Sequence, residues 1–132
     1  MPPRWTHITI NVSNIDRSVE FYTSICGLTI VRDRRKEGRH NVWLGPAVFE
    51  TESPSFVLVM VQDDVKARLD HLGFQCDSRH EVDQIAAFAR DQDILVEPPT
   101  DIGGVVGYFT TIRDPDGHLI EFTFGQPLRG LR

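Results

Sequence analysis

Apolar and polar residues alternate along residues 5–12, the pattern of a β-strand with one buried face. Residues 71–76 alternate in the same way. Each segment leads into apolar residues at helical spacing, the first after Ser13 and Asn14 and the second after the capping-box sequence from Ser78 to Glu81. Gly27 ends the first of these runs. The pattern therefore predicts a strand and an amphipathic helix in each half of the chain.

Three more strands are predicted after each helix. Gly, Pro and polar residues separate the apolar runs, which cover residues 28–32, 41–44 and 56–62 in the first half and 94–97, 107–112 and 118–124 in the second. Asp116 and Gly117 predict a two-residue hairpin turn before the last strand. We expect a single domain over residues 1–132, with module one at 4–62, a connector with short helical character at 63–70, module two at 71–125 and a tail at 126–132.

The second half of the chain repeats the first. A shift of 64 positions lays His7 on His71 and matches the apolar positions of the two opening strands. A shift of 62 positions superimposes the closing strands and sets Val59 against Glu121. The repeat predicts an α+β fold in which two paired βαβββ modules form a curled mixed sheet around a cavity.

The alternation also predicts which side chains line that cavity. Because successive side chains of a strand point to opposite faces, the apolar residues pack on the helix and their neighbours face away. The residues predicted to face the cavity are His7, Thr9 and Asn11 on the first strand, His71, Gly73 and Gln75 on its repeat, and Leu119, Glu121 and Thr123 on the last strand. Both histidines and the glutamate are thus expected on one enclosure.

Two imidazoles and a carboxylate are ligands for a divalent metal ion. A glutamate within the apolar run 119–122 needs a partner. Burying an unpaired neutral polar group costs about 2–7 kcal/mol, and burying an unpaired carboxylate costs more. We predict a metal site formed by His7, His71 and Glu121, the alternative being a purely structural cluster. This set leaves open positions on the ion and suits Fe²⁺, with Mn²⁺, Zn²⁺ or Ni²⁺ as alternatives.

Other polar and aromatic residues are candidates for contacting the substrate. The polar ones are Thr9, Asn11, Gln75 and Thr123, which could instead merely line a wet cavity. Trp43 and Tyr108 are the aromatic candidates, and Trp43 could also pack beneath the pocket. His118 is rejected as a ligand because it falls on the helix side of its strand.

Charge and cysteine content restrict the partners. The formal charge of −5 argues against a nucleic acid or an anionic membrane and favours a small molecule. The cluster of basic residues at 32–40 is expected to form either an exposed loop or an anion-attracting rim over the cavity. The two cysteines, Cys26 and Cys76, are predicted to be free thiols rather than a disulfide. The N-terminus shows no signal-peptide pattern. We expect a cytoplasmic protein.

These motifs resemble the vicinal oxygen chelate superfamily, which includes glyoxalase I, extradiol dioxygenases, fosfomycin-resistance thiol transferases and bleomycin-binding proteins. The resemblance rests on the opening segment 7–12, the helix segment 16–22 ending at Gly27 and Leu28, and the segment 113–122. It implies paired βαβββ modules, a homodimer, and metal ligands at His7, His71 and Glu121. Glyoxalase I carries a fourth ligand where this chain has Val59, so the ligand set is more similar to those of the dioxygenases and fosfomycin-resistance enzymes.

Two classes of function follow from the sequence. The first is a metal-dependent enzyme acting on a small molecule that chelates the ion through adjacent oxygens, dioxygenase-like in preference to a lyase, isomerase or thiol transferase. The second is a non-catalytic protein that sequesters an antibiotic or another small molecule in the same cavity. Retention of His7, His71 and Glu121 favours the enzyme.

Overall fold

Module one opens with strand β1 (His7–Val12) and helix α1 (Ile15–Ser24). The computed structural model describes residues 2–3, 5–47, 54 and 56–126. Asn14 caps α1 by accepting a hydrogen bond from the Arg17 N–H at 3.1 Å. The chain leaves the helix through Gly27, whose φ of 70° is strained for any residue with a Cβ. The predicted cap and stop signal of this helix are both confirmed.

The rest of module one completes a mixed four-stranded sheet. The chain continues through β2 (Thr29–Asp33), the short 3-10 helix η1 (Arg34–Glu37), β3 (Asn41–Gly45) and β4 (Val57–Gln62). The strand order is β1-β4-β3-β2, with β1 parallel to β4 and the other pairs antiparallel.

Module two repeats this topology. Its elements are β5 (Leu72–Gln75), α2 (Arg79–Asp91), β6 (Leu95–Gly103), β7 (Gly107–Arg113) and β8 (Leu119–Phe124). The strand order β5-β8-β7-β6 is that of module one, again with one parallel pair, β5 and β8. The chain divides into two compact units, Met1–Arg68 and Leu69–Arg132, which hold one module each. The prediction of an α+β fold of two βαβββ modules is confirmed.

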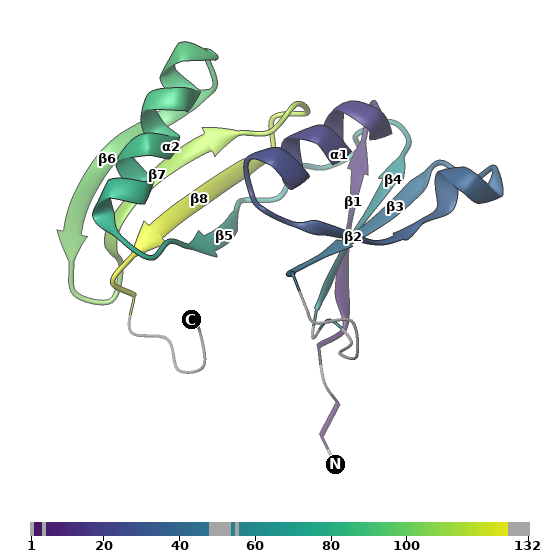
Figure 1. Ribbon diagram of the computed structural model, residues 1–132, viewed down its shortest axis with the longest axis horizontal. Helices are drawn as coiled ribbons and strands as arrows, with labels where there is room; N and C mark the ends of the chain where they lie inside the picture. The colour runs from purple at the N-terminus through teal and green to yellow at the C-terminus, as the bar shows by residue number, and fades with distance from the viewer. Residues whose placement is uncertain (1, 4, 48–53, 55, 127–132) are drawn as a thin grey trace. The chain divides into compact units, whose positions relative to one another are not determined.

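Each helix packs on one face of its own sheet. In Figure 1, α1 lies against β3 and β4, and α2 lies against β6, β7 and β8. Apolar side chains of the strands and helix fill the space between them: Ile10, Val12, Val19, Tyr22, Val42, Leu44, Leu58 and Met60 in module one, and Cys76, Val82, Ala86, Ala89, Ile112, Ile120 and Phe122 in module two. Their burial removes apolar surface from water and is the main source of stability for each module. The faces predicted from strand alternation are therefore correct for these core residues.

The capping box of α2 forms with one difference from the expected pattern. The Ser78 hydroxyl accepts a hydrogen bond from the Glu81 N–H at 3.1 Å, as predicted. The Glu81 carboxylate accepts from the N–H of Asp77 at 2.9 Å, one residue before the cap.

Strand β6 is longer than predicted. The expected strand ended at Glu97, but β6 continues to Gly103 past Pro98 and Pro99. Prolines lack an N–H donor, and they are tolerated here because β6 is the edge strand of its sheet and its pairing with β7 shifts register three times. The Pro pair therefore kinks the strand without ending it.

Two local predictions are wrong. Residues 63–70 contain no helical turn, and only bends interrupt an extended connector. The turn before β8 has three residues rather than two: Asp114 and His118 pair through their backbones, and Gly117 adopts a φ of 85° after Pro115 and Asp116. The Asp114 carboxylate accepts from the N–H groups of Asp116 and His118 and selects this longer turn.

No helix in the described part of the chain is both long and apolar enough to cross a membrane. Apart from Gln126, the tail predicted at 126–132 lies outside the described residues.

Candidate functional site

The open face of the module-one sheet carries the first predicted ligand. His7 and Thr9 lie on β1 beside Val57 and Val59 of β4, and Trp43 of β3 pairs with Val59. Thr6, His7, Trp43, Val57 and Val59 line one pocket of about 200 Å³. The imidazole of His7 is therefore bordered by an indole ring and two valine side chains, an apolar wall with few polar groups.

The open face of the module-two sheet brings together the other two predicted ligands. His71 lies just before β5, and its Nε2 atom is 3.1 Å from Oε2 of Glu121 on β8. Glu121 pairs with Gly73 across the sheet, and a Cβ built on Gly73 would meet no atom within 4 Å. The Glu121 side chain is 16% exposed. The carboxylate therefore stands beside open space rather than beside a packed side chain.

The other ring nitrogen of His71 is also held by a carboxylate. Nδ1 of His71 lies 2.6 Å from Oδ1 of Asp70, the preceding residue. A neutral imidazole has one N–H and can donate to only one of its two carboxylate neighbours. If the neutral ring donates through the shorter contact, to Asp70, its Nε2 lone pair faces the Glu121 oxygen.

This arrangement fits a bound divalent cation. Two lone pairs that face each other repel unless a proton or a cation lies between them. Ligand atoms at adjacent positions of an octahedral ion, each about 2.1 Å from it, lie about 3 Å apart. The 3.1 Å separation of His71 Nε2 and Glu121 Oε2 matches that spacing, and the nitrogen and oxygen donors suit Fe²⁺, Mn²⁺ or Zn²⁺.

His7 belongs to module one, and its role as third ligand stays a prediction. Its Nδ1 lies 2.8 Å from the Thr6 hydroxyl, again the side chain of the preceding residue. Within the residues that the structure describes, no group of three or more His, Cys, Asp or Glu side chains is placed to hold a metal ion. The structure therefore brings together two of the three predicted ligands.

The residues predicted to contact the substrate differ in their exposure and in their hydrogen-bond partners. Gln75 pairs with Thr123 on the same face as Glu121, but the Thr123 hydroxyl is buried and donates to the Val106 carbonyl at 3.1 Å. Thr9 is exposed, and Asn11 lies two residues further along its strand. Trp43 lies on the pocket beside His7, so it lines this pocket rather than packing beneath it.

Tyr108 lies on the opposite face of its sheet. It pairs with Phe124, whereas Thr111, three residues on, pairs with Glu121. Its hydroxyl donates to the Asp83 carboxylate on α2, and the Arg79 guanidinium lies 4.6 Å from its ring centre. The Asp83 hydrogen bond, which holds the neutral phenol, raises the pKa of Tyr108. The structure therefore does not bring Tyr108 to the Glu121 side chain, and we leave it out of the proposed site.

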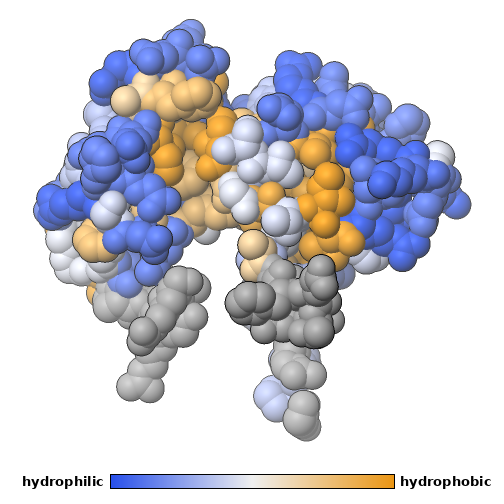
Figure 2. All heavy atoms as spheres, viewed as in Figure 1, coloured by the Kyte–Doolittle hydropathy of each residue, from blue (hydrophilic) through white to orange (hydrophobic). Residues whose placement is uncertain are grey.

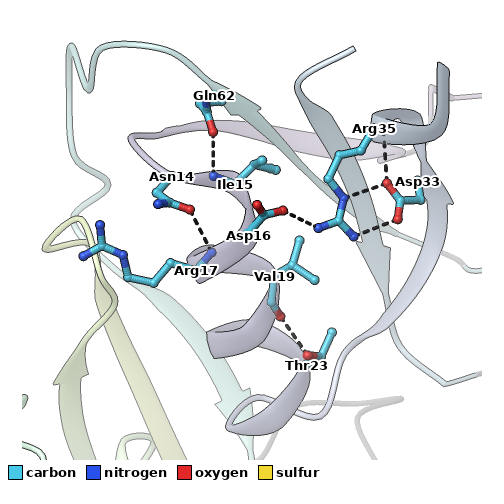
Figure 3. A network of polar contacts seen from close by, with 9 residues as sticks. All are labelled: Asn14, Ile15, Asp16, Arg17, Val19, Thr23, Asp33, Arg35 and Gln62. Carbon is cyan, nitrogen blue, oxygen red and sulfur yellow. Dashed lines mark hydrogen bonds and ion pairs between the residues drawn. The ribbon is translucent and has the colours of Figure 1, made fainter. Parts of the chain in front are cut away.

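The basic cluster at residues 32–40 is largely paired with acidic side chains. Arg35 binds both oxygens of Asp33 and reaches Asp16 at the start of α1 (Figure 3). Arg32 and Arg34 both bind Glu37. Figure 2 shows a hydrophilic surface over the η1 region, in keeping with these exposed charges. Most of the positive charge is thus neutralised locally, which supports the exposed-loop interpretation over an anion-attracting rim.

The same region joins α1 to the end of the sheet. The side-chain oxygen of Gln62, the last residue of β4, accepts from the Ile15 N–H at 2.9 Å (Figure 3). Within α1, the Thr23 hydroxyl donates to the Val19 carbonyl. This network fixes the start of α1 on the sheet, and we assign it a structural role.

Neither cysteine forms a disulfide, as expected. Burial, with smaller contributions from Glu81 and Asp77, raises the pKa of Cys76 to about 12. Such a thiol stays protonated at neutral pH and is not a nucleophile.

Thr6 and Asp70 were not among the functional candidates predicted from the sequence, and Gly73 was predicted only to face the cavity, without a role of its own. Thr6 and Asp70 each precede a candidate histidine at equivalent places in the repeat, and that adjacency was a readable signal. Gly73 had no such signal, because its importance depends on its pairing with Glu121.

The fold agrees with the comparison to known families. Residues 4–122 match the family model of the glyoxalase/bleomycin resistance protein/dioxygenase superfamily. The chain belongs to this superfamily. An uncharacterized protein of Pseudomonas aeruginosa is 33% identical, over 97% of this chain and 93% of its own. A lactoylglutathione lyase of Arabidopsis thaliana is 29% identical over 89% of the chain, which spans only 43% of that enzyme.

A solved superfamily structure has the same fold. The E126Q mutant of the fosfomycin resistance protein FosX from Listeria monocytogenes, complexed with Mn(II) and 1S,2S-dihydroxypropylphosphonic acid, aligns with a TM-score of 0.75. The alignment covers 96% of this chain and 95% of that one at 18% identity. Members of the superfamily thus differ in their activities. Membership alone therefore does not determine the reaction of this chain, which depends on the residues of its own site.

Proposed function

We propose that this protein is a divalent-metal-dependent enzyme that acts on a small molecule with two adjacent oxygen donors. His7, His71 and Glu121 would hold the ion, and the reaction would be dioxygenase-like with Fe²⁺. The observation that carries the proposal is the 3.1 Å approach of His71 Nε2 to Glu121 Oε2, with Nδ1 of the same ring held by Asp70.

The absence of a fourth protein ligand supports this reaction class over a lactoylglutathione lyase. Val59 stands on the His7 face at the place that Glu121 occupies in the other module, and an aliphatic side chain cannot bind a metal ion. Three protein ligands leave about three positions of an octahedral ion for exchangeable ligands. Two adjacent substrate oxygens and a further small ligand fill that number.

The residues of the chain have separate tasks in this reaction. When bound, the ion supplies Lewis acidity, which lowers the pKa of a coordinated hydroxyl group. Trp43, Val57 and Val59 form an apolar wall beside His7. The open space over Gly73 lets a planar or branched substrate approach the Glu121 carboxylate. Thr9 and Gln75 would orient polar groups of the substrate.

Anaerobic purification followed by metal analysis tests the proposal. The wild-type chain is expected to carry close to one divalent ion per chain, and His71→Ala is expected to lose it. His80→Ala is the matched control, because His80 is exposed on α2 and has no part in the site. Equal metal content in the two variants would contradict the ligand assignment.

Oxygen uptake then tests the reaction class. The Fe²⁺-loaded protein is expected to consume oxygen with at least one member of a catechol panel, and Glu121→Gln is expected to abolish that uptake. Metal binding without oxygen uptake across the panel would instead favour a lyase, isomerase or thiol transferase. Ligand binding that survives chelator treatment would identify a non-catalytic sequestering protein. Size-exclusion chromatography tests the accompanying proposal of a homodimer.

A further inference from the structure

The Asp70 carboxylate determines which nitrogen of His71 is available. Asp70 Oδ1 lies 2.6 Å from Nδ1, whereas Glu121 Oε2 lies 3.1 Å from Nε2. An ionised carboxylate can only accept hydrogen bonds, so the Asp70 contact requires a proton on Nδ1. When the ring is neutral, this proton leaves Nε2 as a lone-pair donor beside Glu121.

Without Asp70 the same ring would place its proton differently. Among the residues that the structure describes, the remaining carboxylate in contact with the ring would be Glu121, and donation to it requires the proton on Nε2. In that tautomer Nε2 has no lone pair, and an incoming metal ion would first have to displace the proton to Nδ1. The carboxylate at position 70 therefore sets a tautomer that suits metal binding.

The repeat provides an internal comparison. The Thr6 hydroxyl holds Nδ1 of His7 at 2.8 Å, at the place in module one that Asp70 occupies in module two. A hydroxyl can donate or accept, so Thr6 is compatible with either tautomer of His7. The two histidines are thus unequal, and only that of module two has its tautomer determined by its neighbour.

We propose that Asp70 is a positioning residue of the metal site, which holds the Nδ1–H group of His71 and presents the Nε2 lone pair beside Glu121. The inference rests on the proposed function for its metal role, but the tautomer is a property of the chain without the ion. Hydrogen-bonding partners of this kind orient metal-binding histidines, and their loss typically weakens metal affinity about 10- to 100-fold.

The first test is nitrogen NMR of the histidine side chains in the metal-free protein. At a pH where the rings are neutral, wild-type His71 is expected in the Nδ1–H form. Asp70→Asn keeps an accepting oxygen and should preserve this form, whereas Asp70→Ala should move the proton to Nε2. An unchanged His71 tautomer in Asp70→Ala would overturn the proposal.

The second test is a titration of the same proteins with Mn²⁺. Asp70→Ala is expected to raise the dissociation constant about 10- to 100-fold and Asp70→Asn by less, since the amide retains the hydrogen bond. Asp91→Ala, which removes an exposed carboxylate at the end of α2, should stay within about twofold of the wild type. The Asp70 side chain is 96% exposed, so its removal leaves the core intact, and thermal melting verifies this.

The outcomes separate the two proposals. A wild-type chain that binds no divalent ion would overturn the proposed function together with the metal role of Asp70. A wild-type chain that binds Mn²⁺ no better than Asp70→Ala does would overturn the role of Asp70 and leave the proposed function standing.

Discussion

Val59 and Glu121 occupy the same place in the two modules. Val59 on β4 pairs with Thr9 on β1, and Glu121 on β8 pairs with Gly73 on β5. The shifts of 64 and 62 positions found in the sequence carry one pair onto the other. Module one therefore offers an aliphatic side chain where module two offers a carboxylate, and this difference determines the proposed ligand number.

Val59→Glu is expected to add a fourth ligand. A carboxylate 4 Å from a cation contributes up to about 4 kcal/mol at an effective dielectric constant of about 20, so Mn²⁺ should bind at least about tenfold more tightly. Catechol-dependent oxygen uptake should fall, because fewer positions remain for the substrate. The control is Val61→Glu, two residues further on the same strand face. Equal affinities in the two variants would show that position 59 does not lie at the ion.

Tyr108→Phe is expected to leave metal binding and turnover unchanged. The Tyr108 hydroxyl is committed to Asp83 on the helix side of the sheet, away from the Glu121 face. Loss of this exposed hydrogen bond should leave the free energy of unfolding nearly unchanged, because water can replace the partner. Urea denaturation and the metal titration measure the two effects. A tenfold loss of turnover with an intact fold would place Tyr108 in the chemistry after all.

Acidification is expected to weaken module one through Asp33. The hydrogen bond from the Arg35 side chain holds the pKa of Asp33 below its ordinary value of 3.8. The folded state therefore gains stability from this carboxylate above about pH 4 and loses it as the pH falls through the lowered pKa. Between pH 6 and pH 3, the melting temperature of Asp33→Asn should fall less than the melting temperature of the wild type. Asp64→Asn, whose carboxylate has no arginine partner among the contacts described, should keep the wild-type slope.

The thiol of Cys76 is expected to be unreactive in the folded protein. Its pKa of about 12 leaves almost no thiolate at pH 8, and its side chain is buried. In a Cys26→Ala variant, Ellman's reagent should label no thiol within minutes until urea is added. Cys76→Ala, which retains the half-buried Cys26, should react faster. Rapid labelling of Cys76 in the native state would show that this part of the core opens readily.

Local patterns in the sequence were sufficient for the secondary structure and for the faces of the strands. Alternation predicted β1 and β5, the caps at Asn14 and Ser78 predicted where the helices begin, and the repeat predicted two modules with the same βαβββ succession. These signals work because they depend on interactions within a few residues. The prolines in β6 and the turn at Asp114 escaped them, since both depend on how a strand meets its neighbour.

The sequence by itself determined the family, the two modules and the face on which His71 and Glu121 lie, because periodicity and repetition are properties of the chain order. Only the tertiary structure decided the 3.1 Å approach of these two side chains, the open space over Gly73, the separation of Tyr108 from that face and the pairing of Arg35 with Asp16. Each of these is set by strand register and side-chain packing between residues far apart in the chain, and no local pattern encodes such contacts.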